Sequence, residues 1–335
     1  MSAHRGRAGG GAPLGAAPPP WAAAECRVLG REEPAPGYVR LLLEAPGLAA
    51  RARPGQFLHV HCGHGREPLL RRPLSVHDAD PAAGTVALLV RVVGRGTALI
   101  AGVAVGDVLD VLGPLGRGFD AAGGGTHAGV HASAQSGARA DAQGGALALV
   151  AGGAGVAPLV FAARASARRA VHALLGARTA AELVSVAELG RWGARVRVAT
   201  DDGTSGHHGP VTDLLEDLLA RQGGGRASGA VDAPREVWAC GPLPMLRRVA
   251  AIAGGAGVRC LVSLEAHMAC GVGACRGCAW PAPGAGESAG AGESAGAGES
   301  AGAGESAGAG GCATTPSYVH ACRDGPVFDA REVAL

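Results

Sequence analysis

Short apolar runs alternate with turn residues through the first third of the chain. They are Cys26–Leu29, Tyr38–Leu43, Gln56–His61, Pro73–Val76, Val86–Val93 and Val108–Leu112. Runs of this length, separated by Gly, Pro and Asp, are typical of antiparallel β-strands. The pattern predicts that residues 22–119 form a small antiparallel β-barrel.

A different pattern begins at Ala146, where apolar strands alternate with helical stretches. The predicted strands are Ala146–Val150, Val171–Leu175, Val196–Ala199 and Glu236–Ala239. The predicted helices are Pro158–Ala170, Val211–Leu219 and Pro244–Ala253. Alternation of this kind is typical of a parallel sheet covered by helices, so residues 146–262 are predicted to form an α/β domain.

Three segments have no sustained period of either kind. Residues 1–21 are rich in Gly, Pro and Ala and are predicted to be a disordered tail, and residues 120–145 a flexible linker. Four tandem Gly-Ala-Gly-Glu-Ser-Ala units fill 284–307, within a low-complexity stretch that continues to 311. These units contain no bulky apolar residue that would form a core, so a solvated loop is predicted there.

Composition excludes several classes of function. The net charge is only +2 and no Arg-rich block is interleaved with aromatic residues, which gives no indication of nucleic-acid binding. No apolar run is long enough to cross a membrane, and the N-terminus has no apolar signal segment. We therefore expect a cytoplasmic protein without membrane association. All 30 basic residues are Arg and 58 residues are Gly, so isolated glycine motifs carry little weight.

The spacing of the cysteines predicts a metal centre. Cys270, Cys275 and Cys278 have the C-x4-C-x2-C spacing of plant-type [2Fe–2S] loops, in which a distant fourth cysteine completes the set. Small residues between them let the backbone wrap closely and direct amide groups at the sulfurs. A structural zinc site and a set of reduced, buried cysteines are the alternatives, although two separated C-x2-C pairs are absent.

Two cysteines are candidates for the fourth ligand. Cys312 and Cys322 both follow the repeat segment. Cys322 is favoured because Asp324-Gly325-Pro326 supplies a turn directly after it, which Val327-Phe328 would anchor.

Nucleotide-binding signals follow the predicted strands of the α/β domain. Gly152, Gly153 and Gly155 form a turn between a strand and a helix, where amide groups can meet a phosphate. A tight turn without a ligand explains them equally well. Asp202 and Cys240 follow two other strands, at the end of the sheet where parallel α/β domains bind ligands. Cys240 would either face a nicotinamide ring or close its strand as a buried small residue.

Two further motifs lie in the predicted barrel. Arg72-Pro73-Leu74-Ser75 places a guanidinium and a hydroxyl on one strand, which suits a phosphate and a ring heteroatom. Residues 91–97 end another strand and open a predicted helix, Ala98–Val103, which provides a second helix N-terminus for a pyrophosphate. Each motif alone is a weak signal, since an Arg on a strand is usually a solvated charge.

The order of these motifs resembles one family. The chain is similar to the electron-transfer subunits of NAD-dependent (class 1B) dihydroorotate dehydrogenase, in the ferredoxin-reductase superfamily. The matching stretches are RRPLSV (71–76), RVVGRGT (91–97), GPLGRGF (113–119), GGAGVAP (152–158), TDDGTSGHHGPVTDLL (200–215), CGPLPML (240–246), SLEAHMACGVGACRGC (263–278) and CRDGPVF (322–328). The cysteine stretch with its Ser-Leu-Glu lead-in is the most specific.

This resemblance implies an α+β multi-domain protein. It assigns FAD to the barrel at 22–119, NAD(H) to the α/β domain at 146–262 and a [2Fe–2S] cluster to a small domain at 263–335. The implied cluster ligands are Cys270, Cys275, Cys278 and Cys322. The implied FAD contacts are Arg72, Pro73, Leu74, Ser75, Leu89, Val90, Arg91, Gly96 and Thr97. The segments 120–145 and 284–311 look like insertions relative to the family.

The resemblance also implies a function in pyrimidine biosynthesis. Electrons would pass from an FMN-containing dihydroorotate dehydrogenase catalytic subunit through the cluster and FAD to NAD⁺, in a heterotetramer with two copies of each subunit. The present chain would not bind dihydroorotate itself. The alternatives are a reductase subunit of a sulfhydrogenase or of a ferredoxin-dependent transhydrogenase, and a zinc-bound interaction module without redox activity.

Overall fold

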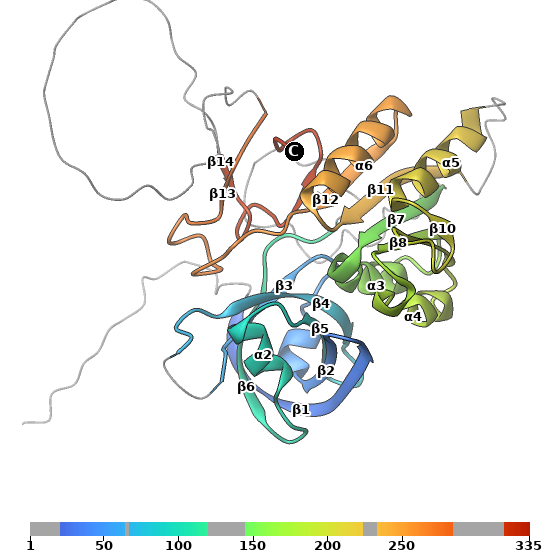
Figure 1. Cartoon of the computed structure of the whole chain (residues 1–335). Coiled ribbons are helices and arrows are strands. Elements are labelled where there is room, and N and C mark those ends of the chain that lie inside the picture. The colour runs from blue at the N-terminus through green and yellow to red at the C-terminus, as the bar shows by residue number, and fades with distance from the viewer. Residues whose placement is uncertain (1–20, 64–66, 120–144, 224–232, 284–317) are drawn as a thin grey trace, which may run out of the picture.

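The computed structural model describes residues 21–63, 67–119, 145–223, 233–283 and 318–335. Residues 1–20 of the predicted tail, most of the predicted linker, the repeat segment and Cys312 lie outside the described residues. No helix in the described part of the chain is both long and apolar enough to cross a membrane. Figure 1 shows a β-barrel below a layered sheet domain, with the cysteine-rich segment beside both.

The first unit is a closed antiparallel barrel, as the alternating pattern predicts. Its strands pair in the order β1-β2-β5-β4-β3-β6. Their bounds are β1 Ala22–Ala35, β2 Tyr38–Glu44, β3 Phe57–Val60, β4 Arg72–Asp80, β5 Thr85–Arg91 and β6 Val108–Leu115. Two short helices, α1 (Pro46–Ala49) and α2 (Arg95–Ala101), connect strands. Alternate residues of each strand point into the barrel, and Leu41, Leu58 and Leu88 form part of a completely buried interior.

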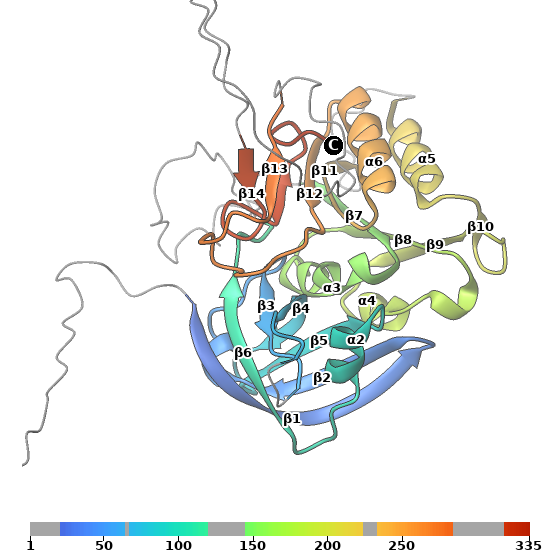
Figure 2. The same cartoon turned by 60° about the vertical axis from the view of Figure 1, so that its left-hand side comes forward.

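The second unit is a seven-stranded sheet in the order β10-β9-β8-β7-β11-β12-β15. All its strand pairs are parallel except β12 with β15. The strands are β7 Ala146–Gly152, β8 Val171–Ala177, β9 Arg195–Thr200, β10 His207–His208, β11 Pro234–Cys240, β12 Arg259–Ser263 and β15 Val327–Asp329. The helices are α3 Val156–Ala165, α4 Val186–Arg191, α5 Val211–Gly223 and α6 Leu243–Gly255. Helices α3 and α4 cover the face toward the barrel, and α5 and α6 the other face (Figure 2).

The helix predicted at Pro158–Ala170 begins two residues earlier and ends five residues earlier, at Ala165. Residues 166–169 turn back instead, because the chain must reverse to enter the parallel strand β8.

The C-terminal segment contacts both units. A two-stranded sheet of β13 (Ala279–Pro281) and β14 (Tyr318–His320) follows the three cysteines of the C-x4-C-x2-C stretch. Strand β15 then joins the edge of the large sheet, with Val262 opposite Phe328. The sequence pattern did not predict β15, since three residues are too short to show a period.

Helix α3 packs directly on the barrel. The Arg164 guanidinium donates to the Asp78 carboxylate and to the Ala79 carbonyl, both at 2.8 Å, and lies 5.3 Å above the Trp192 ring. Phe161, from the same helix, packs against the barrel interior. These contacts fix the distance between the barrel and the strands of the sheet.

Glu188 of α4 makes a second ionic contact between the two units. Its carboxylate accepts from Nε2 of the fully buried His77 at 3.0 Å and lies 3.4 Å from Nε of Arg40. Burial alone would raise the pKa of Glu188, but His77, Ser185 and Arg40 outweigh it and lower that pKa from 4.5 to about 2. The ionised carboxylate therefore stabilises the contact between the units.

We expect Glu188→Gln to lower the free energy of unfolding by about 1–3 kcal/mol at pH 7, the usual cost of losing a hydrogen bond to a charged group. Because the folded-state pKa lies below the unfolded value, this difference should be complete above about pH 4.5 and vanish as the pH falls toward 2. Urea unfolding of both proteins across this range measures it.

Glu44→Gln is the matched control, since its ion pair with Arg27 is long, at 3.9 Å, and both side chains are 59% exposed. Its removal should change stability little at any pH. Equal destabilisation by the two substitutions, or a loss at Glu188 that did not depend on pH, would contradict the account.

Candidate functional site

The predicted flavin residues come together where β4 begins and β5 ends. Arg72 opens β4, and its guanidinium lies against Gly96: a Cβ on Gly96 would be 2.5 Å from Nε of Arg72. Nη1 of Arg72 donates to the Leu70 carbonyl at 2.6 Å. Gly96 thus leaves room for the Arg72 guanidinium in the position it adopts here.

Helix α2 begins at Arg95, three residues before the predicted start at Ala98. Thr97 therefore lies inside the helix, and its hydroxyl accepts from the backbone amides of Val93 and Gly94 at 2.9 and 3.1 Å. The hydroxyl group stabilises the first turn, as Ser and Thr side chains do near helix N-termini. It is thus already engaged with its own helix.

Three of the nine predicted flavin residues have buried apolar side chains. Leu74 and Val90 belong to the barrel interior, and Leu89 packs between barrel and sheet. Only their backbone groups are available to a ligand. Pro73 and Ser75 are half-buried on β4, and Arg91 is exposed at the end of β5.

The glycine turn lies at the switch point of the sheet. The chain leaves β7 toward β8 on one side, whereas β11 lies on the other, and this is where open α/β sheets bind ligands. Cys240 pairs with Ala151 across these strands. A Cβ on Gly155 would be 2.2 Å from the Cys240 carbonyl oxygen, and one on Gly152 would be 2.8 Å from Sδ of Met245. Glycine is required at both positions, so the tight-turn explanation holds whether or not a nucleotide binds.

The turn also meets the barrel. A Cβ on Gly153, whose φ is +53°, would lie 3.5 Å from the Tyr38 hydroxyl and 3.7 Å from Nη1 of Arg91. The Arg91 guanidinium lies 5.8 Å above the Tyr38 ring. Arg91, Gly153 and Cys240 are thereby gathered between the two units.

Sequence reasoning did not single out Tyr38 and Glu265. The Tyr38 hydroxyl is buried and has no hydrogen-bond partner in the described chain, so a polar partner is expected there. Surrounding protein raises the pKa of Glu265 by desolvation, and Arg91 offsets part of that rise. Tyr38 begins an apolar strand, so the sequence pattern gave no sign that its hydroxyl would matter. Glu265 belongs to the Ser-Leu-Glu lead-in, a signal that was available.

Burial, followed by the negative charge of Glu265, raises the pKa of Cys240 to about 12. Cys240 is therefore a neutral thiol and does not act as a nucleophile at neutral pH. The side chain lies buried at the end of β11, opposite Ser263 of β12.

Asp202 lies apart from these residues. It follows β9, which β8 separates from β7, and it is exposed. The side chain and amide of Thr204 donate to its carboxylate at 2.6 and 3.0 Å and lower its pKa. Asp202 thus flanks the end of the sheet without touching the glycine turn.

The four predicted ligand cysteines converge in two pairs. Sγ of Cys278 lies 3.2 Å from Sγ of Cys322, and both residues are buried. The backbone amide of Cys275 donates to Sγ of Cys270 at 3.4 Å. A two-iron cluster is held by four cysteine thiolates, and these two pairs, Cys270 with Cys275 and Cys278 with Cys322, supply four thiols.

Backbone amides point at all four sulfurs. Besides the Cys275 amide, which donates to Cys270, three further amides do so. The Gly273 amide donates to Sγ of Cys322 at 3.1 Å. The Gly277 amide donates to Sγ of Cys275, and the Cys322 amide to Sγ of Cys278, both at 3.4 Å. Gly271 and Gly273 have left-handed φ values of +72° and +82°, which glycine adopts readily. Such amides stabilise thiolate charge and are typical of iron–sulfur loops.

The pKa values of the thiols follow this geometry. Burial opposes ionisation of Cys270, but the amides of Cys275 and Val272 outweigh it and lower its pKa to about 7. Burial and the neighbouring Cys278 raise the pKa of Cys322 to about 12. A bound cation would supply the positive charge that the buried Cys278 and Cys322 need in order to ionise.

A single-ion zinc site fits this arrangement less well. Among the residues that the structure describes, no three His, Cys, Asp or Glu side chains surround one point that would hold a single metal ion. A structural zinc needs four ligands around one centre. The two pairs of cysteines do not meet this requirement.

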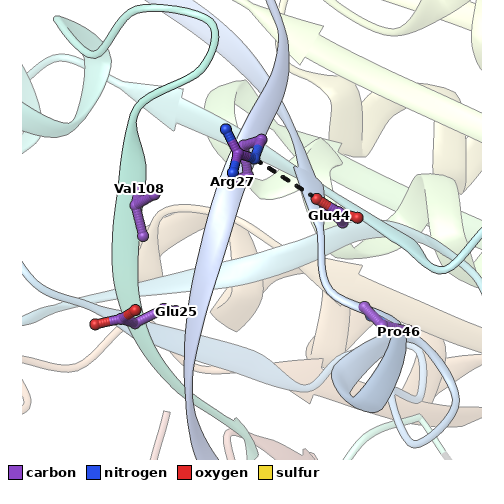
Figure 3. A pocket seen from close by; sticks show the side chains of 5 residues that line it. All are labelled: Glu25, Arg27, Glu44, Pro46 and Val108. Carbon is purple, nitrogen blue, oxygen red and sulfur yellow. Dashed lines mark ion pairs between the residues drawn. The ribbon is translucent and has the colours of Figure 1, made fainter.

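A hollow on the barrel lies elsewhere. Figure 3 shows it, a cavity of about 290 Å³ lined by Glu25, Arg27, Glu44, Pro46 and Val108. None of the predicted site residues lines it, so it has no part in the cofactor site.

Comparison with known proteins decides the family. Residues 38–119 match the family model described as the oxidoreductase FAD-binding domain. The chain is 36% identical over 257 residues to the "Dihydroorotate dehydrogenase B (NAD(+)), electron transfer subunit" of Desulforamulus reducens, covering 76% of this chain and 87% of that one. It is also 36% identical to the protein of that name from Bacillus caldolyticus, covering 84% and 87%. The chain belongs to this family of electron-transfer subunits.

The chain shares its architecture with a solved structure of NADH-dependent reduced ferredoxin-NADP oxidoreductase. That structure was described in connection with flavin-based electron bifurcation. The TM-score is 0.66 at 26% identity, over 93% of this chain and 90% of that one. The predicted fold is thereby confirmed for the barrel and the parallel-sheet domain. The comparisons support FAD and NAD(H) as cofactors.

We expect Arg72→Ala to weaken FAD binding about 10–100-fold, because a charge-assisted contact is worth about 1.5–3 kcal/mol. Fluorescence titration of the apoprotein with FAD measures the dissociation constant. Arg27→Ala is the control, since Arg27 lies on the barrel hollow of Figure 3 and should leave FAD binding unchanged. Unchanged FAD affinity in Arg72→Ala would exclude Arg72 from the site.

Proposed function

We propose that this chain is the electron-transfer subunit of an NAD-dependent dihydroorotate dehydrogenase. It would take two electrons from dihydroorotate oxidation on a partner subunit that contains FMN and deliver them, with one proton, to NAD⁺ as NADH. The observation that carries the proposal is the pairing of Cys278 with Cys322, and of Cys270 with Cys275, beside an FAD-type barrel, within a chain of this family.

The two cofactors supply complementary chemistry. When bound, FAD exchanges a hydride with a nicotinamide and single electrons with a [2Fe–2S] cluster. The residues of the chain bind and orient these groups. Arg72 and the backbone of residues 73–75 and 89–90 would bind FAD, and Arg91 would meet its ring edge together with the unpartnered Tyr38 hydroxyl.

The sheet domain would bring NAD(H) to the same place. The glycine turn, at the switch point, provides backbone approach for phosphates, and Cys240 presents a small neutral surface beside it. Asp202 would contact the far end of the nucleotide, since it follows a strand two places along the sheet. No residue of the chain is assigned to dihydroorotate.

The partner proposed here is the FMN-containing catalytic subunit, with two copies of each subunit in the complex. The support is the name of the relatives, which describes one subunit of a larger enzyme. Its location is proposed to be the cytoplasm, where a biosynthetic dehydrogenase meets its NAD⁺ pool.

A second candidate is a reductase subunit of another flavin and iron–sulfur complex. The likeness to NADH-dependent reduced ferredoxin-NADP oxidoreductase favours it. The partner protein separates the two candidates. Co-purification of the chain with its native partner, followed by mass identification, identifies that protein.

The proposal predicts which components dihydroorotate-dependent NAD⁺ reduction requires. The purified chain should pass electrons from NADH to an artificial acceptor but should not oxidise dihydroorotate. Adding the FMN-containing subunit should restore dihydroorotate-dependent NAD⁺ reduction, and Cys270→Ser should abolish that coupled activity while sparing much of the NADH-to-dye reaction. Dihydroorotate oxidation by the isolated chain, or full coupled activity of Cys270→Ser, would show the route to be wrong.

The fourth ligand has its own test. Cys322→Ser should lose the [2Fe–2S] signal, because Sγ of Cys322 lies beside Sγ of Cys278 and accepts the Gly273 amide. Cys312→Ser should retain the signal and the iron content. Iron analysis and the electron paramagnetic resonance (EPR) spectrum after reduction measure both variants. Equal loss in the two, or loss in Cys312→Ser alone, would assign the ligand differently.

A further inference from the structure

Arg178 lies just beyond the end of the strand next to the glycine turn. Strand β8 runs parallel to β7 with Gly176 paired to Gly152, so Arg178 comes two residues after the position level with the start of that turn. In α/β domains that bind dinucleotides, the ribose is met about 20 residues beyond the glycine turn, by an acidic residue for NAD or by an Arg for the 2′-phosphate of NADP. Arg178 therefore lies where the two nucleotides would be distinguished.

The Arg178 guanidinium is already engaged. Its Nε and Nη2 donate to the two carboxylate oxygens of Glu182 at 3.1 and 2.5 Å, which makes a bidentate pair. The same edge of a guanidinium would bind a phosphate in this two-point manner. The Glu182 side chain is 21% exposed and that of Arg178 is 68% exposed, so the carboxylate is the more buried member of the pair. A phosphate would have to displace this carboxylate or bind beside it.

The turn that carries Glu182 is fixed by the loop after the next strand. Glu182 ends η4 (Ala180–Glu182), a single 3₁₀ turn, and the Ala180 amide donates to the Thr204 hydroxyl at 2.8 Å. That hydroxyl donates to the Asp202 carboxylate at 2.6 Å, and the Asp202 amide donates to the Arg178 carbonyl at 3.2 Å. The loops after β8 and β9 thus form one hydrogen-bonded unit around the pair.

Acidic residues outnumber basic ones around this pair. In segments 176–182 and 200–204, at the ends of β8 and β9, Arg178 is the single basic residue, whereas Glu182, Asp201 and Asp202 are acidic. Both aspartates are exposed. The 2′-phosphate of NADP carries nearly two negative charges, whereas the 2′-hydroxyl of NAD is neutral and can donate to a carboxylate. These charges repel the phosphate, and repulsion of the wrong ligand is a usual source of specificity.

We propose that Glu182 makes this chain selective for NAD(H) over NADP(H), because it occupies the Arg178 guanidinium and places a negative charge where the 2′-phosphate would bind. The inference rests on the proposed function, which places the nucleotide at the glycine turn. An Arg at this position would by itself favour NADP(H), and Glu182 reverses that preference.

The experiment measures oxidation of NADH and of NADPH by an artificial electron acceptor, with the full-length chain loaded with its cofactors. In Glu182→Gln, kcat/KM for NADPH should rise about tenfold or more, mainly through a lower KM, because the freed guanidinium can bind the 2′-phosphate. For NADH, kcat/KM should stay within about threefold, since its 2′-hydroxyl carries no charge. The gain with NADPH should shrink at high ionic strength, as a contact between exposed charges does.

The double variant Glu182→Gln/Arg178→Ala tests the mechanism, since it removes the guanidinium that the single variant frees. It should lose the gain with NADPH. Glu216→Gln is the matched control, because it makes the same change in a carboxylate that accepts from Arg248 on the other face of the sheet. It should leave both kcat/KM values unchanged. If Glu182→Gln does not fold, Glu182→Ala, which also removes the charge, replaces it with the same expectation.

An unchanged preference for NADH in Glu182→Gln, or a loss of NADH oxidation without a gain with NADPH, would overturn the inference while leaving the proposed function intact. A gain that survives in the double variant, or a wild-type chain that uses NADPH as readily as NADH, would overturn it as well. A wild-type chain that oxidises neither nucleotide would overturn both the inference and the proposed function.

Discussion

The packing of α3 between the barrel and the sheet is the constraint on which the rest of the molecule depends. Phe161 enters the edge of the barrel core, Arg164 binds Asp78 and Ala79 of β4, and the apolar face of the helix covers β7. Because the glycine turn directly precedes α3, docking the helix also places Gly153 beside Tyr38 and Arg91. One helix thus brings a nucleotide-type turn against the FAD-type barrel, beside β2 and β5 (Figure 2).

The cysteine segment depends on the same frame through different contacts. Phe57 and Leu115 of the barrel pack against Met268, Cys278 and Cys322, and β15 joins the edge of the sheet. The loop is therefore held on two sides before any metal binds. Its amides already point at the sulfurs, which lowers the reorganisation needed for ligands to converge.

Much of the architecture was predictable, because its signals are local and repeat along the chain. The strand pattern predicted all six barrel strands. The alternation of strands and helices predicted four of the parallel strands, β7, β8, β9 and β11, but not β10 or β12. The cluster ligands stay a prediction of the C-x4-C-x2-C spacing and the family resemblance, although Sγ of Cys278 does lie 3.2 Å from Sγ of Cys322. Strand β15 and the early start of α2 were not predictable, since one depends on an edge partner distant in sequence and the other on the Thr97 hydroxyl. Tyr38 and Glu265 acquire their significance only when the barrel, the sheet and the loop meet.

The central claim is that one chain binds both a flavin and a two-iron cluster that exchange electrons. Anaerobic titration of the purified, cofactor-loaded chain with NADH, followed by absorbance and low-temperature EPR, tests it most directly. The account predicts that NADH bleaches the flavin band and also produces the EPR signal of a reduced [2Fe–2S] cluster, in a protein with about two irons per chain. A protein that binds zinc in place of iron, or an iron–sulfur signal that NADH cannot generate through the flavin, would contradict it.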